Sequence, residues 1–490
     1  MTTRGQPKRP ASRPKQPGGG EHKRPAKAPP GAARALRGLR QAPATVREKL
    51  PLLRPGVLRR GSEPTVEGLT PEAALHASSN FRKGVLNGVV FTMIEALIAP
   101  SLVLAWYING LGAPNALVGL LPAILAGGWF LPQMFVASRV QGRPYMKAFY
   151  RNVGIARALF MAVLAVLTVV FAAQPVVLLV VFFAFFTLYS FSAGISGIPW
   201  YEMISKTISP RRRGTFFGLR NFWGGLVALG VAAPVGAIMS EQIGLAFPYN
   251  FALIFGLTAA AVLVGVYAWS SIHEPAAATT AKPMSVRQLF RRGREAFRTD
   301  RDYRSFMVAR VLISLAAIAD PFYVVYAKNV LGAPAATVGL YLGASSVASL
   351  LSNFFWSPLS DRASNRTVMT MTVLATALVP LTAVAISLFV GQVDNTFLFT
   401  SFTLVFVLGG LAVGASRIVN NNMLLTVAPP AELATYVGFL NTVLGVVIFV
   451  PVLGGLLTDL VGYEPLFLTS VGLAGLSLIA ATKMSTRRPV

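Results

Sequence analysis

Runs of about 20 apolar, uncharged residues recur along the chain, and this pattern restricts the fold more than any other feature of the sequence. An α-helix rises about 1.5 Å per residue, so each run is long enough to cross the roughly 30 Å hydrocarbon layer of a bilayer. Only 13% of the 490 residues are charged, about half the share in a soluble domain. We therefore expect an all-α polytopic membrane protein with twelve transmembrane helices. The predicted spans are 84–108, 113–136, 153–173, 176–200, 216–239, 250–271, 305–327, 336–358, 368–390, 396–418, 435–458 and 465–482.

The two halves of the chain repeat each other at an offset of 220 residues. LGAPNALVGL, at 111–120, returns as LGAPAATVGL at 331–340, with eight of ten positions identical. Nine more identities follow at the same offset without a gap, from Gly194 and Gly414 to Gly225 and Gly445. Chance similarity between apolar helices would not keep one register across loops, so we predict two parallel-related six-helix halves. The predicted domains are the halves 81–271 and 304–485, the linker 272–303, the tail 1–80 and the C-terminus 486–490.

Basic residues indicate the orientation of the chain in the membrane. The short connections after every odd-numbered span contain one basic residue, Lys328, whereas the connections on the other side contain many arginines and lysines. The positive-inside rule places that basic side, together with both termini, in the cytoplasm. We therefore expect a multi-pass protein of the plasma (inner) membrane.

The N-terminal tail is a separate basic segment. Residues 1–83 contain 18 Lys and Arg against 5 Asp and Glu, so they hold +13 of the net charge of +26. The tail is rich in proline and glycine, and we expect residues 1–80 to be disordered and cytoplasmic. Basic residues near a membrane surface attract anionic lipids, so we expect such lipids at the tail and at the central linker, whose segment 286–297 has an amphipathic pattern. A solvated tail that only reinforces orientation is an equal alternative. The tail has no aromatic residues to stack on bases, so we do not expect nucleic acid as a partner. We expect the protein to be a monomer.

The sequence contains few of the residue types that commonly carry enzyme chemistry. The chain has no cysteine, and its three histidines, His22, His76 and His273, all fall outside the apolar runs. These counts argue against thiolate or multi-histidine metal sites and against a cysteine nucleophile. The sequence also lacks a Gly-x-x-x-x-Gly-Lys-Ser/Thr loop for nucleotide binding. We expect no enzyme activity, no cofactor and no metal.

Loop motifs resemble those of the major facilitator superfamily of secondary transporters, over about residues 81–485. The segment 357–366, SPLSDRASNR, matches the loop signature of that family at Asp361, Arg362 and Arg366, although both glycines are lost. A weaker first copy, RVQGR at 139–143, keeps the basic residue Arg143. Between the fourth and fifth spans, the residues Glu202, Pro210, Arg213 and Gly214 are similar to an acidic residue followed by a Pro-x-x-Arg-Gly turn of the family. The resemblance implies cytoplasmic gating roles for Arg143, Glu202, Arg213, Gly214, Asp361, Arg362 and Arg366.

Two carboxylates inside the apolar spans are candidate proton-coupling residues, because ionisable groups at membrane depth mark ion and substrate pathways. Glu95 lies twelve residues after Lys83, about 18 Å along the first span and near the membrane midplane. Asp320 lies in the outer half of the seventh span, before the kinking Pro321. Arg310 precedes Asp320 by ten residues, about 15 Å, so the two cannot pair. Arg310 is a candidate for binding an anionic group of the substrate or for neutralising Glu95. A purely structural role is an equal alternative for Arg310 and Asp320.

The substrate cavity is predicted to lie between the halves, as in transporters built from such repeats. Its predicted lining residues are polar or aromatic and lie on several spans or just after the tenth: Thr92, Tyr189, Trp200, Arg310, Asn420 and Asn421. Arg157 and Arg417 lie near inner helix ends, where snorkelling explains them better than cavity lining does.

These features predict a secondary active transporter that moves a small organic solute by alternating access, coupled to protons. One alternative is a multidrug-type efflux antiporter, since Gly230-x-x-x-Pro234-x-Gly236 resembles the antiporter motif of the family. An alternative from another class is a non-transporting membrane receptor or scaffold that uses the basic tail. The partners predicted for the transporter are a small-molecule substrate and protons.

Overall fold

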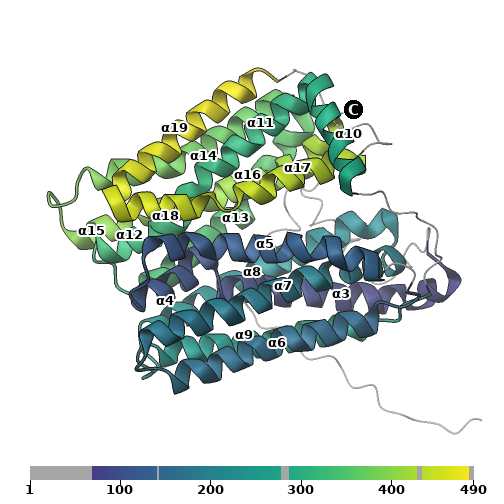
Figure 1. Cartoon of the computed structure of the whole chain (residues 1–490), viewed down its shortest axis with the longest axis horizontal. Helices are drawn as coiled ribbons and strands as arrows, with labels where there is room; N and C mark the ends of the chain where they lie inside the picture. Colours follow the sequence, from purple (N-terminus) through teal and green to yellow (C-terminus); the bar gives the residue numbers. More distant parts are fainter. Residues whose placement is uncertain (1–68, 141–142, 277–285, 428–432, 485–490) are drawn as a thin grey trace, which may run out of the picture. The chain divides into compact units, whose positions relative to one another are not determined.

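The computed structural model describes residues 69–140, 143–276, 286–427 and 433–484. In this described part, twelve helical segments are long and apolar enough to cross a membrane, which confirms the predicted number of spans and the all-α class. Figure 1 shows the helices of the N-terminal half, in purple to teal, packed on one another, and those of the C-terminal half, in green to yellow, doing the same.

The N-terminal half contains the first six spans. Its first and fifth spans are each made of more than one helical segment. The segments are α3 Pro71–Leu97, η2 Pro100–Leu104 and α4 Ala105–Gly110, then α5 Asn115–Val140, α6 Lys147–Val170, α7 Pro175–Thr207, η3 Pro210–Arg212, α8 Arg213–Met239 and α9 Tyr249–Ser270.

The C-terminal half contains the other six spans, and three of them are made of several segments. The helix α10 precedes these spans at the end of the linker. The segments are α10 Val286–Thr299, α11 Arg301–Ala316, η4 Ala317–Phe322, α12 Tyr323–Asn329, α13 Thr337–Arg362, α14 Asn365–Ser387, α15 Asn395–Ser401, α16 Thr403–Val427, α17 Leu433–Val447, α18 Val450–Val461 and α19 Tyr463–Thr482.

Helix breaks occur at related places in the two halves. The first span changes to a π-helical turn at Pro100, and the seventh changes to a 3₁₀ turn that contains Asp320, which stands 220 residues after Pro100. The eleventh span breaks between α17 and α18, just before Pro451. Proline lacks an amide hydrogen and cannot donate to the carbonyl four residues earlier, which accounts for breaks at Pro321 and Pro451. Broken helices of this kind form substrate sites in transporters.

Contacts between the halves involve small residues at repeat-related positions. The helix α5 packs on α18, and α13 packs on α8. A Cβ atom added at Gly119 would overlap the backbone carbonyl of Pro451, and one added at Gly339 would lie 2.7 Å from Cα of Gly236. Gly119 and Gly339 are 220 residues apart, so the sequence repeat is also a repeat of packing. Backbones approach this closely only where side chains are absent.

The first span begins earlier than the sequence analysis predicted. We placed residues up to 80 in the tail, but α3 begins at Pro71. The hydroxyl of Thr70 accepts a hydrogen bond from the backbone N–H of Ala73, and Glu72 lies in the first turn. These are standard features of a helix start, so Thr70-Pro71-Glu72 was a readable signal. The tail prediction is therefore wrong for residues 71–80, and residues 1–68 lie outside the described part.

The linker helix α10 is amphipathic, as predicted, but its apolar face packs against protein. Gly293 and Ala296 are buried, and the ring of Phe290 lies 5.2 Å from the ring of Phe439 on α17. Three arginines on the helix, Arg291, Arg292 and Arg294, remain exposed. The helix is thus anchored to the C-terminal half and presents a basic face outward.

A histidine pair joins the start of α3 to the segment after α9. The rings of His76 and His273 stack with their centroids 3.7 Å apart. The amide group of Asn80 also donates to the carbonyl of His273 at 2.9 Å and accepts from its N–H at 3.0 Å. Desolvation and the neighbouring His76 lower the pKa of His273. The folded protein therefore favours neutral His273.

Acidification is expected to loosen this contact. Because the pKa of His273 is lower in the folded state, its contribution to stability is present above the unfolded value and is lost as the pH falls below about 6.5. Amide exchange within 71–80 should accelerate when the pH drops from about 7.5 to about 5.5, after correction for intrinsic rates. The His273→Gln variant should show no such acceleration. An equal acceleration in both proteins would show that the pair is not responsible.

Candidate functional site

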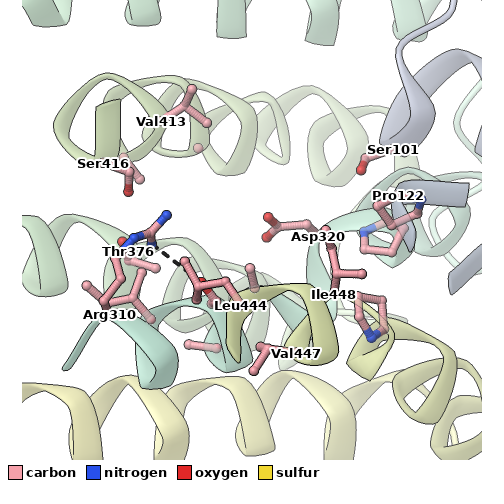
Figure 2. A pocket seen from close by; sticks show the side chains of 18 of the residues that line it. Ser101, Pro122, Arg310, Asp320, Thr376, Val413, Ser416, Leu444, Val447 and Ile448 are labelled. Carbon is pink, nitrogen blue, oxygen red and sulfur yellow. Dashed lines mark hydrogen bonds between the residues drawn. The ribbon is translucent and has the colours of Figure 1, made fainter. Parts of the chain in front are cut away.

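A cavity of about 970 Å³ opens among helices of both halves, most of them from the C-terminal half. Figure 2 shows part of its lining. Its walls are largely apolar, with a few hydroxyl, amide and charged groups. The lining residues from the N-terminal half are Ser101, Pro122, Phe130 and Tyr201, and those from the C-terminal half are Arg310, Ile313, Ser314, Ala316, Ala317, Asp320, Pro321, Tyr323, Thr376, Val379, Pro380, Gly409, Ala412, Val413, Ser416, Leu440, Asn441, Leu444, Val447, Ile448 and Pro451.

The three helix breaks converge on this cavity. Ser101 comes from the π-helical turn η2, Asp320 from the 3₁₀ turn η4, and Pro451 from the α17–α18 junction. A tighter or wider helical turn redirects side chains and leaves backbone groups without helical partners, which is why such turns are frequent at functional sites. A proline lies at each of these three breaks, so the local sequence determines where the helices break and thus which residues line the cavity.

Arg310 and Asp320 are the charged residues among the described residues of the lining. An Arg310 guanidinium nitrogen, Nη1, lies 3.4 Å from the hydroxyl of Ser314, and the buried Nε has no hydrogen-bond partner among the described residues. Asp320 is exposed to the cavity. Within the described residues, its carboxylate makes no hydrogen bond or ion pair. In Figure 2 both charged groups are directed into the cavity, Arg310 beside Thr376 and Asp320 on the side of Ser101.

The cavity contains only some of the predicted site residues. Of the candidates, Arg310 and Asp320 line it, and Glu95, Thr92, Tyr189 and Trp200 do not. Thr92 lies where α3 meets α8, since a Cβ added at Gly224 would be 2.6 Å from its hydroxyl oxygen. The side chains of Asn420 and Asn421 lie outside the described residues.

A second polar cluster lies inside the N-terminal half. A guanidinium nitrogen of Arg157 donates to the hydroxyl of buried Tyr189 at 2.8 Å. The guanidinium carbon also lies 4.2 Å from the centroid of that ring and 5.2 Å from that of Phe91. Arg157 therefore points into the helix bundle and does not snorkel to the surface. The snorkelling explanation of Arg157 is wrong, because cation–π contacts and a hydroxyl acceptor stabilise its charge inside the half.

Arg220 belongs to the same half and was overlooked as a site candidate. It donates to the carbonyl of Gly84 at 2.7 Å and to the side-chain oxygen of Asn87 at 3.2 Å. Its guanidinium carbon lies 5.0 Å from the ring of Trp200. Glu95 is exposed and close enough to Arg220 and Tyr189 to interact with both electrostatically. Glu95 thus lies in a basic environment in the N-terminal half.

One of the residues predicted to gate the cytoplasmic end, Glu202, makes contacts within the N-terminal half. Glu202 forms an ion pair of 2.8 Å with Lys206, which forms a second ion pair of 3.0 Å with buried Glu274. The carboxylate of Glu274 also accepts from the backbone N–H groups of Met146 and Lys147, at the start of α6. A carboxylate at a helix N-terminus is stabilising. These contacts hold α7, the start of α6 and the segment after α9 together.

Other gating candidates have local contacts. Arg213 donates to the carbonyls of Ile208 and Ser205, near the C-terminal end of α7. Gly214 faces open space, and the guanidinium carbon of Arg143 lies 5.6 Å from the ring of Phe149. Arg366 is half-buried near the start of α14. The side chains of Asp361 and Arg362 lie outside the described residues, so the gating role of this loop stays a prediction.

The opposite end of the bundle holds direct contacts between the halves. The carboxylate of Asp459, on α18, accepts from the side chain of Asn115 at 2.8 Å and from the backbone N–H groups of Asn115 and Ala116 at 3.1 and 3.2 Å. Asp459 therefore caps the N-terminus of α5 in the other half. Nearby, the ammonium nitrogen of Lys328 lies 5.0 Å from the ring of Trp106.

Comparisons with known proteins support this architecture. Residues 306–490 match the sequence model of the Major Facilitator Superfamily. The structure resembles a mutant form of the nucleoside transporter NupG with a TM-score of 0.62 and 15% identity, covering 82% of this chain and 98% of that one. It also resembles a D-xylose-proton symporter, with a TM-score of 0.60, 14% identity and coverage of 84% and 98%. No curated protein matches the sequence.

A bacterial homologue of the iron transporter ferroportin in its inward-facing state is similar as well, with a TM-score of 0.60 and 13% identity over 84% of this chain and 99% of that one. The family match and the fold agree. Residues 306–490 therefore resemble the Major Facilitator Superfamily in sequence, and the fold resembles those of the solved transporters. Identities this low establish the shared fold and leave the substrate open.

Two residues that line the cavity were overlooked, although the sequence repeat pointed to them. Ser416 and Asn441 line the cavity, and both are identical to residues of the first half, Ser196 and Asn221, at the 220-residue offset. Polar identities between two diverged apolar halves were therefore a usable signal. Of two neighbouring aromatic residues, Tyr201 lines the cavity and Trp200 does not. Sequence reasoning missed this difference, because span boundaries alone do not show which face of a helix points inward.

Proposed function

We propose that this protein is a secondary active transporter that moves a small organic solute across the plasma membrane by alternating access, coupled to protons. The observation that carries the proposal is the cavity lined by both halves, where Arg310 and Asp320 are directed into shared space. Charged groups in a membrane-spanning bundle are costly unless they pair, and they mark substrate and ion pathways. A cavity of about 970 Å³ is also in the range that binds small molecules.

Alternating access requires contacts that close one end and then separate. The contacts of Asp459 with Asn115 and Ala116 join the halves at the end that we expect to face outside. The small-residue contact of Gly119 with Pro451 adds to this closure. In the proposed cycle these contacts break when the cavity opens outward. Rigid-body rocking of the halves about the cavity satisfies this requirement.

Coupling to protons is proposed through a carboxylate whose protonation changes the relative stability of the two facing states. Asp320 is the favoured candidate, because it lines the cavity and has no ion-pair partner among the described residues. Glu95 is the second candidate, because it is a carboxylate at membrane depth that lies near Arg220 but outside this cavity. We retain the proposed cytoplasmic location of both termini and the attraction of the basic face of α10 to anionic lipids.

The structure gives less support to a multidrug-type efflux antiporter than the sequence did. Gly236, which belongs to the suggested antiporter motif, is explained by packing, since a Cβ added there would lie 3.1 Å from Cα of Gly339. The described lining of the cavity also includes two charged residues, whereas broad apolar substrates favour an uncharged lining.

The test is a panel of radiolabelled solutes in proteoliposomes with an imposed pH gradient. At least one small organic solute should accumulate above its equilibrium level, and a protonophore should abolish that accumulation. Liposomes without protein are the control. A panel in which no solute moves, with correctly inserted protein, would contradict the proposed function.

A further inference from the structure

The charge pattern of the cavity restricts what can bind there. Among the 25 described residues that line the cavity, one is a cation and one is an anion. The remaining walls are mostly apolar, and a few hydroxyl and amide groups such as Thr376, Ser416 and Asn441 contribute hydrogen-bonding capacity. Electrostatic interactions in such surroundings are stronger than in water, so these two charges dominate the recognition of a ligand.

Arg310 and Asp320 do not neutralise each other. The guanidinium group lies beside Ser314, six residues before Asp320. With α-helical rise up to Ala316 and the longer 3₁₀ rise through η4, this spacing corresponds to roughly 10 Å. A direct ion pair needs an N–O distance of about 4 Å or less. Each group therefore presents its charge to the cavity separately.

We propose that the substrate is dipolar, with an anionic group such as a carboxylate bound by Arg310 and a cationic amino group bound by Asp320, several bonds apart. ω-Amino acids and short peptides have this chemistry. The proposal rests on the proposed function, in which this cavity holds the substrate. Arginine matches a carboxylate with two parallel hydrogen bonds, and its Nε has no partner among the described residues.

Apolar residues of the cavity lining can contact the uncharged middle part of such a dipolar ligand. Val379, Leu444 and Ile448 line the cavity and provide apolar surface for methylene groups or small side chains. A ligand with a single charge would bury one protein charge without a partner, and an unpaired buried charge is strongly unfavourable. The site therefore discriminates against singly charged ligands as well as attracting dipolar ones.

Direct binding to the detergent-purified full chain tests the proposal without any gradient. The probes are 6-aminohexanoate, hexanoate and hexylamine, which have the same carbon chain but different charged ends, together with glycine and trialanine. At least one of 6-aminohexanoate and trialanine should bind about tenfold more tightly than hexanoate, hexylamine and glycine. Equal affinity for a singly charged probe or for glycine would overturn the proposal, and so would a failure of both long dipolar probes to bind.

Single substitutions test which residue binds each charged end of the ligand. Arg310→Gln should remove the advantage of 6-aminohexanoate over hexylamine, and Arg310→Lys should restore part of it. Asp320→Asn should remove the advantage over hexanoate. If these variants fail to fold, the comparison of probe affinities with the unchanged chain still tests whether the site prefers dipolar ligands. A protein that transports only uncharged solutes would refute this inference alone, whereas dipolar binding without transport of any solute would refute the proposed function alone.

Discussion

Replacing Asp320 with asparagine is expected to abolish solute accumulation driven by a pH gradient. Asparagine has nearly the shape of the protonated aspartic acid but cannot release a proton, so the gradient can no longer change the relative stability of the facing states. Accumulation in proteoliposomes should fall to the level of liposomes without protein. Glu295→Gln is the control, because it removes one negative charge from the exposed face of α10, and Glu295 does not line the cavity.

The Glu95→Gln variant tests which of the two candidate carboxylates couples transport to protons. If Asp320 couples transport to protons, Glu95→Gln should retain a pH-dependent accumulation. The opposite result, in which Glu95→Gln loses accumulation but keeps downhill exchange while Asp320→Asn concentrates solute with the parent's pH dependence, would make Glu95 the coupling residue. Counterflow at equal pH on both sides measures downhill exchange independently of coupling.

The fold was predictable because its main determinants are local or repeated in the sequence. Twelve apolar runs determine the spans, and the 220-residue repeat determines that the halves share one topology. The turn before the second span and its copy before the eighth even share a glycine with positive φ, 81° at Gly112 and 68° at Gly332. Glycine adopts this conformation without steric cost, so its recurrence reflects one turn used twice. The missed start of α3 at Pro71 shows that helix capping must be considered along with hydropathy.

The site was only partly predictable because its geometry depends on helix breaks and rotations. Hydropathy identified Arg310 and Asp320, since charges stand out in apolar spans. It did not show that a 3₁₀ turn at Asp320 and a π-helical turn at Ser101 direct these residues into one cavity. Nor did it show that Arg157 and Arg220 point inward to Tyr189 and Asn87. Which side of a helix faces the cavity is decided by tertiary packing, which spacing along one sequence does not contain.

Gly119→Ala is expected to shift the protein toward a state that is open at the Lys328 end. The added methyl group would overlap the backbone carbonyl of Pro451, and a backbone group cannot move aside by changing rotamer. Overpacking of this kind costs about 1–3 kcal/mol. The contact joins the two halves and must separate when that end opens, so the cost falls on the closed state. The ratio of open to closed protein should therefore rise about 5- to 150-fold.

Labelling of an introduced cysteine measures this shift, and the absence of native cysteines removes background labelling. A Ser101→Cys reporter on the cavity wall should react faster in the Gly119→Ala background with a membrane-impermeant maleimide added from the Lys328 side. Gly127→Ala, on the same helix α5, is the matched control, because a Cβ there meets only side-chain atoms at 3.8 Å or more. Asp459→Ala should act in the same direction as Gly119→Ala, since it removes the cap that holds α5. Equal labelling rates in the Gly119→Ala and Gly127→Ala backgrounds would mean that the α5–α18 contact does not hold this end closed.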